Sequence, residues 1–263
     1  MNQSRGLDQP HVRRICLPLA VIAVALVILG PVLRYRAAVR RRSNPDESAV
    51  LPTMFDVNTE ANLPSWFSTS LWLLCAVTAV VIGVLLGRAS WYLLAAICAL
   101  ASADEAATLH ENLLGAIGAS IDNSILHFTW VVPGLLVAAL VALMFVRLVR
   151  SLPTRARRGL ITAGALFLAG SIGAETISGL VLRAQGDGFG YVAATSVEEG
   201  LEMAGVLLFL ATLLSLLQFR RIEHRAHVSV DQRLLPPPRR RATPAREPSS
   251  RRVSTIHGGA LAS

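Results

Sequence analysis

Charged side chains interrupt three stretches of this sequence that are otherwise apolar. Asp104, Glu105, His110 and Glu111 lie in the first stretch, Glu175 in the second, and Glu198, Glu199 and Glu202 in the third. An ionisable side chain in the middle of a membrane-spanning helix costs ~2.5–3.5 kcal/mol on insertion scales, and such residues normally face the interior of a helix bundle. The pattern therefore predicts a buried site that is rich in carboxylates.

The chemistry of such a site depends on what balances its negative charge. Several carboxylates cannot all be ionised together in a low dielectric, so they must hold protons or share a cation. Oxygen-rich coordination with few nitrogen ligands favours Mg²⁺, Ca²⁺ or Mn²⁺. The side chains expected to bind a divalent metal ion are Asp104, Glu105, His110, Glu111, Glu175 and Glu202. Glu198 or Glu199 would then be the general base that activates a metal-bound water, as in a hydrolase acting on lipid-like substrates.

Two other functions fit the same residues. Acids inside a membrane also carry ions in proton- or cation-coupled transporters, although the inner halves of these stretches are apolar. Protonated acids can instead act as hydrogen-bonding contacts between the helices of a structural protein. The sequence lacks the Gly-x-Ser-x-Gly pattern of serine hydrolases and the paired Glu-x-x-His pattern of di-iron bundles. The hypotheses thus include an enzyme, a transporter and a structural protein.

Six apolar stretches are long enough to cross a ~30 Å hydrocarbon core, which requires about 20 helical residues. They comprise residues 15–33, 67–87, 91–114, 126–149, 159–183 and 191–217. A backbone inside lipid must satisfy its own hydrogen bonds, and these stretches are too long to be barrel strands. The sequence therefore predicts an all-α fold, a polytopic transmembrane helical bundle of about six helices.

Helical spacing places the acids on particular faces of these predicted helices. At about 100° per residue, the acids of residues 198–202 point within roughly 100° of one another, and Glu175 lies on the same side as Ser171 and Ser178. At a rise of about 1.5 Å per residue, these acids and Asp104 fall at mid-depth or in the outer half of the bilayer. The prediction is one site that three helices share.

The distribution of arginine predicts the orientation of the helices. The formal net charge is +8, and residues 220–263 hold ten Arg against three acidic residues. Arginines also crowd the loop after the fourth predicted helix, so this loop and the C-terminus should be cytoplasmic. Six spans then place both termini in the cytoplasm. The arginines within residues 34–42 follow the first helix on the opposite side and conflict with this orientation.

Both ends of the chain lie outside the predicted bundle. Residues 1–14 form a short cytoplasmic segment, and 15–33 is too long for a signal-peptide core, so we expect it to remain as an anchor. Residues 220–263 are rich in Pro and Arg and are predicted to be disordered. Because the excess charge belongs to this tail, it indicates no nucleic-acid partner. The expected location is the cell membrane, with membrane lipids as partners and anionic headgroups as a ligand that the tail could bind.

A set of motifs follows in order over residues 54–217. They are Phe-Asp-x-x-x-Glu-x-Asn-x-Pro-x-Trp-Phe, Ser-x-Asp-Glu followed by His-Glu, Trp-Val-x-Pro-Gly, Gly-x-Glu and Glu-Glu-x-x-Glu-Met. Together they resemble a family of uncharacterised bacterial multi-pass, six-helix integral membrane proteins. This resemblance implies the six-helix fold and no activity. The chain is more distantly similar to alkaline-ceramidase-like membrane hydrolases, but it lacks the several intramembrane histidines that their zinc site needs.

Overall fold

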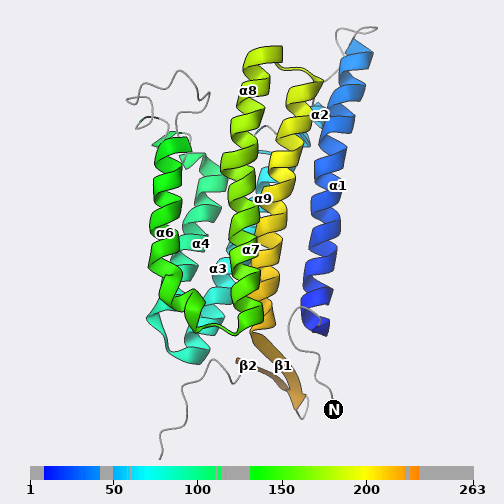
Figure 1. Ribbon diagram of the computed structural model, residues 1–263. Coiled ribbons are helices and arrows are strands. Elements are labelled where there is room, and N and C mark those ends of the chain that lie inside the picture. The colour runs from blue at the N-terminus through cyan, green and yellow to red at the C-terminus, as the bar shows by residue number, and fades with distance from the viewer. Residues whose placement is uncertain are drawn as a thin grey trace, which may run out of the picture.

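The computed structural model describes residues 9–41, 50–57, 59, 61–109, 112–113, 116, 131–222 and 225–230. Its long helices run side by side and form a bundle (Figure 1). The segments long and apolar enough to cross a membrane are Pro10–Arg40, Leu63–Leu86, Val131–Ser151 and Thr154–Gln185. The predicted helical bundle is therefore confirmed, with four spans that satisfy length and composition.

The helices follow one another along the chain with short connections. They are α1 (Pro10–Arg41), α2 (Val50–Met54), α3 (Leu63–Leu86), α4 (Ala89–Ala107), α6 (Val131–Ser151), α7 (Thr154–Leu168), the π-helical turn η2 (Ala169–Ala174), α8 (Glu175–Gln185) and α9 (Phe189–Ser215). Helices α4 and α9 occupy the places of the third and sixth predicted spans, but they carry most of the acids and are not among the four apolar segments. Six spans thus remain a prediction.

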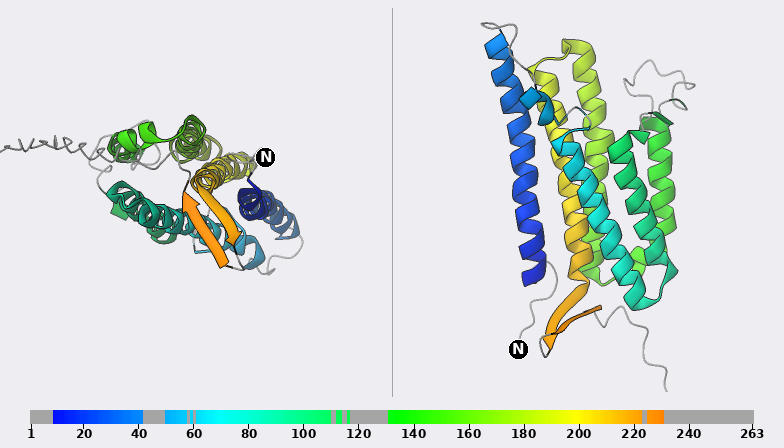
Figure 2. Two further views of the ribbon diagram at one scale, coloured as in Figure 1. Left: turned by 90° about the horizontal axis from the view of Figure 1, so that it is seen from below. Right: turned by 180° about the vertical axis from the view of Figure 1, so that it is seen from behind.

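Helix α9 is the central element of the bundle. Helices α1, α3, α7 and α8 and the turn η2 all pack against it, as the view from below shows (Figure 2). Met203, Val206, Leu210 and Leu213 form a buried apolar face along its second half. Helix α4 packs mainly on α3, and α6 lies at the edge beside α7 and η2. The helix that carries Glu198, Glu199 and Glu202 is therefore enclosed by its neighbours.

Glycines bring α7 close to α9. A Cβ atom on Gly205 would lie 2.7 Å from the backbone nitrogen of Phe167 and 2.9 Å from the carbonyl oxygen of Ala163. A Cβ on Gly159 would lie 2.5 Å from Oγ1 of Thr212. Small residues at a crossing let two helix backbones approach each other. The absence of side chains at these positions therefore sets the distance between α7 and α9.

Local residues determine where α3 and α4 begin and end. The Asn62 side chain accepts a hydrogen bond from the Ser65 backbone N–H, and Ser65 Oγ accepts one from the Asn62 N–H, both at 3.2 Å. This capping box starts α3. Gly87 (φ 62°) ends α3 in the left-handed conformation. Thr108 (φ 49°) ends α4 in the same conformation, and Asn112 Nδ2 donates to its carbonyl at 2.9 Å.

Two helices differ in length from the apolar spans predicted for them. The first predicted span, 15–33, is the middle of α1, which continues over the arginines on both flanks. Arginine is a good helix former and its long side chain can reach the membrane surface, so these flanks extend the helix. The third predicted span, 91–114, ends earlier as the α-helix α4, because the chain turns left-handed at Thr108. The fourth predicted span, 126–149, corresponds to α6, and its first five residues, 126–130, fall outside the described part of the chain.

The start of the tail was predicted to be disordered, and this is wrong for residues 220–222 and 225–230. Strand β1 (Leu217–Ile222) pairs with β2 (Arg225–Val230) in an antiparallel hairpin, with Leu217 opposite Val230. Both of these side chains are buried against the bundle. Apolar residues alternate along both strands, which is the pattern of a half-buried strand. Residues 231–263 lie outside the described part.

Arg34 joins three segments at the end of the bundle opposite the hairpin. Its Nη1 donates to Oδ2 of Asp56, before α3, at 3.0 Å, and its Nη2 donates to Oδ1 of Asp187, between α8 and α9, at 2.5 Å. One of the arginines that conflicted with the predicted orientation is therefore balanced by two acids.

We expect Arg34→Gln to lower the free energy of unfolding by about 1–2 kcal/mol, because two charge-assisted hydrogen bonds are lost at a partly exposed site. Thermal unfolding of the purified protein in detergent measures this. Arg36→Gln, an exposed position two residues further along α1, serves as control and should change stability by less than about 0.5 kcal/mol. Equal effects of the two variants would contradict a role for the ion pairs.

Candidate functional site

A π-helical turn directly precedes Glu175. The segment Thr154–Gln185 is continuously helical over 32 residues, but its hydrogen-bond pattern changes in η2. Such turns add one residue to a helix, rotate the residues that follow, and often occur at functional sites. The predicted span 159–183 lies within this segment, but the sequence analysis treated it as a regular α-helix and did not predict the π-helical turn. The run Ala-Gly-Ser-Ile-Gly-Ala is the only local sign of it.

The helix after this turn presents a buried polar face to α9. Glu175 and Ser178 are 7% and 1% exposed, and Ser171 on the preceding turn is also buried. The helical spacing predicted this shared face. Ser178 Oγ lies 2.8 Å from Oε2 of Glu198 on α9 and 3.0 Å from the carbonyl oxygen of Glu175. Ser178, which the sequence analysis placed on the face of Glu175 but not among the site residues, therefore links α8 to an acid of α9.

Glu202 occupies the middle of α9, with 189–201 before it and 203–215 after it. Its side chain packs on the bare backbone of Gly170 in η2, where a Cβ would lie 2.6 Å from Cγ of Glu202. The same Cβ would lie 2.9 Å from the Glu198 carbonyl oxygen. The glycine thus provides the space that the Glu202 side chain occupies.

Acids from three helices lie near enough to Glu202 for their charges to act on it. The carboxyl groups whose charges act on it are those of Glu199, Glu105, Glu198 and Glu175. We call these five residues the carboxyl cluster. Asp104 is half-buried beside Glu105 in the last turn of α4. The structure therefore brings together acids that are almost 100 residues apart in the sequence.

The structure shows no metal site among the predicted ligands that it describes. Within the described ranges, no group of three or more His, Cys, Asp or Glu side chains is arranged to hold a metal ion. Two of the expected ligands, His110 and Glu111, lie outside these ranges. The metal site, and the role of Glu198 or Glu199 as a general base beside it, thus stay predictions.

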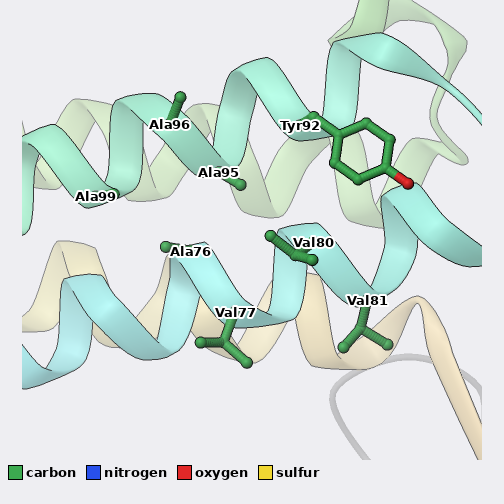
Figure 3. Close-up of a pocket in the computed structure, with 8 residues that line it drawn as sticks. All are labelled: Ala76, Val77, Val80, Val81, Tyr92, Ala95, Ala96 and Ala99. Atoms are coloured by element: carbon green, nitrogen blue, oxygen red, sulfur yellow. The ribbon is translucent and has the colours of Figure 1, made fainter.

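An open groove of about 390 Å³ lies between α3 and α4, away from the cluster (Figure 3). Alanine and valine side chains line it together with Tyr92. None of the predicted site residues contributes to it. A groove of this composition offers hydrocarbon contact and almost no polar chemistry, so we do not assign the reaction or transport site to it.

Comparison with known proteins gives one match. A family model described as a domain of unknown function (DUF8692) matches residues 19–217. No curated protein and no solved structure matches the chain. The match covers α1 to α9 and confirms that the relatives are uncharacterised, as the resemblance implied. The motifs and the bacterial origin stay predictions.

Proposed function

We propose that the chain, which belongs to the family of the domain of unknown function DUF8692, is a membrane transport protein coupled to protons or to a cation exchanged for them. The four apolar segments support its insertion in a membrane. The observation that carries the proposal is the meeting of acids from α4, α8 and α9 around Glu202. The carboxyl cluster is the ion-binding site in this proposal.

The electrostatics of the cluster support exchange of protons. Carboxylates that lie close together in a low dielectric repel one another, so ionising one of them favours a proton on its neighbours. The protons of such a group are coupled, and a proton or a small cation bound there offsets the repulsion between the carboxylates. Intramembrane acids with these properties form the proton relays of pumps and transporters.

The hydrogen bonds of Ser178 connect the cluster to the neighbouring helix. Ser178 Oγ donates to Glu198 Oε2 at 2.8 Å and lies 3.0 Å from the Glu175 carbonyl oxygen. A polar contact between α8 and α9 therefore holds one acid of the cluster in position.

The packing below the cluster fits one state of a transport cycle. Met203, Val206, Leu210 and Leu213 close the second half of α9 against its neighbours. In alternating access, a binding site near the membrane midplane is open to one side at a time. The sealed half of α9 is consistent with a state in which the cluster has no access from the hairpin end.

The proposal is tested with Glu202→Gln in the full-length protein, reconstituted into liposomes that contain a pH-sensitive dye. We expect wild-type protein to move protons in response to an imposed pH or cation gradient, and Glu202→Gln to abolish this movement, because glutamine cannot exchange a proton. Infrared spectra of the same samples should show a carboxylic-acid band that changes with pH in the wild type and decreases in the variant.

Asp187→Asn is the matched control, since it removes an acid at the far end of α8 and α9. This variant should keep proton movement and the carboxylic-acid band. Absence of proton movement in the wild type would favour the structural hypothesis, and movement that Glu202→Gln leaves unchanged would contradict the role assigned to Glu202. Bound metal, measured by mass spectrometry and lost in a folded Asp104→Ala/Glu199→Ala variant, would instead favour the metal-dependent hydrolase.

A further inference from the structure

The β-hairpin carries an apolar face beyond the part that the bundle covers. Side chains alternate along a strand, so Phe219 and its partner Val228 share a face with Leu217 and Val230. Leu217 and Val230 are buried, whereas Phe219 and Val228 are 48% and 36% exposed. The Phe219 ring contacts that of His11 at the start of α1, with 4.8 Å between centroids. The apolar surface therefore continues from the bundle towards the tip of the hairpin.

The hairpin is held close to the end of the helix bundle. One residue, Leu216, separates it from α9, and seen from below it crosses the end of the bundle (Figure 2). Gln9, just before α1, donates to the Ser215 carbonyl at 3.0 Å and thereby places the start of α1 beside the end of α9. The exposed pair Phe219–Val228 is thus held at the level where the apolar helices end.

Positive charge gathers at this end. The first turns of α1 and α7, the end of α6 and the hairpin each carry at least two arginines. None of the acidic residues in the described part of the chain lies there: they belong to α4, α8 and α9 around the cluster or to the Arg34 ion pairs. An end face with arginines and without described acids complements a negatively charged layer.

We infer that the hairpin is an interfacial anchor that binds anionic phospholipid headgroups in the leaflet at this end. Phe219 and Val228 enter the boundary between headgroups and acyl chains, where apolar and aromatic side chains of amphipathic elements lie. The arginines of the hairpin and of the neighbouring helix ends bind the lipid phosphates. This anchoring does not depend on the function of the carboxyl cluster.

The test uses the full-length protein in nanodiscs made of phosphatidylcholine, either alone or mixed with phosphatidylglycerol. Hydrogen–deuterium exchange of residues 217–230 should slow by several-fold when phosphatidylglycerol is present, and high salt should reverse this. Native mass spectrometry should show that phosphatidylglycerol stays bound to wild-type protein in preference to phosphatidylcholine. Equal exchange and equal retention in the two lipid mixtures would overturn the inference.

Paired variants identify the surface. Arg220→Gln/Arg221→Gln should weaken phosphatidylglycerol retention by roughly fivefold for each charge removed, and Phe219→Ser should remove the lipid-dependent slowing of exchange. Arg36→Gln/Arg183→Gln removes the same charge from exposed positions at the opposite end and should leave retention unchanged. Equal losses from the two arginine pairs would overturn a specific role for the hairpin, even if one variant has a less stable strand pair.

Discussion

Replacement of Gly205 with alanine is expected to lower the free energy of unfolding by about 1–3 kcal/mol. The new Cβ would meet backbone atoms of α7 at 2.7 Å and 2.9 Å, and backbone cannot rotate away as a side chain can. Helices α7 and α9 must therefore move apart, which also separates the buried residues along their contact. A decrease in thermal unfolding temperature in detergent measures the effect.

Gly164→Ala is the matched control for this experiment. Gly164 lies on α7, the helix that Gly205 of α9 approaches, but a Cβ there would have no neighbour within 4 Å. Alanine has the higher helix propensity, so the control should be neutral or more stable by up to about 1 kcal/mol. A Gly205→Ala protein as stable as the control would contradict the close approach of α7 and α9.

Gly170→Ala is expected to disable the carboxyl cluster while leaving every acid in place. The added methyl group would take the space of the Glu202 Cγ atom and press on the Glu198 carbonyl oxygen and the Glu202 nitrogen, at 2.9 Å and 3.1 Å. The Glu202 side chain would have to leave its position, and α9 would have to shift at its midpoint. We expect a loss of about 1–3 kcal/mol in stability together with the loss of proton movement.

Gly173→Ala lies in the same π-helical turn but would place its Cβ in open space. It should keep both stability and proton movement, which separates a crowding effect from an effect on the turn itself. Proton movement in liposomes and the infrared band of carboxylic acids are measured for both variants. Normal movement in a Gly170→Ala protein would contradict the role assigned to the position of Glu202.

The convergence of the acids could be predicted from the sequence, because two regular properties of helices were sufficient. The spacing of Glu198, Glu199 and Glu202 placed them on neighbouring parts of one helix, and helical rise placed them at the depth of Glu175 and of Asp104, the neighbour of Glu105. The structure brings these five carboxyl groups together. The calculation needed the direction of each helix but no knowledge of its neighbours.

Features that depend on contacts between distant segments could not be predicted in this way. The partners of Arg34 are 22 and 153 residues away along the chain, and no periodic pattern links them. The π-helical turn differs from an α-helix by one hydrogen-bond shift, which an apolar run does not reveal. Strand β1 was missed because its arginines were interpreted together with the Pro- and Arg-rich residues that follow it.

The position of α9 has a consequence for how the protein is made. The ribosome synthesises this helix after the other helices that the structure describes, yet it is the one that most of them contact. Helices α1, α3 and α7 must therefore enter the membrane without their principal partner and wait for it. In turn, α9 has three acids that oppose insertion into lipid, and the acids they meet belong to the earlier helices α4 and α8. The bundle can therefore form only after α9 has been synthesised, and a chain interrupted before residue 189 would lack the helix on which α1, α3, α7 and α8 pack.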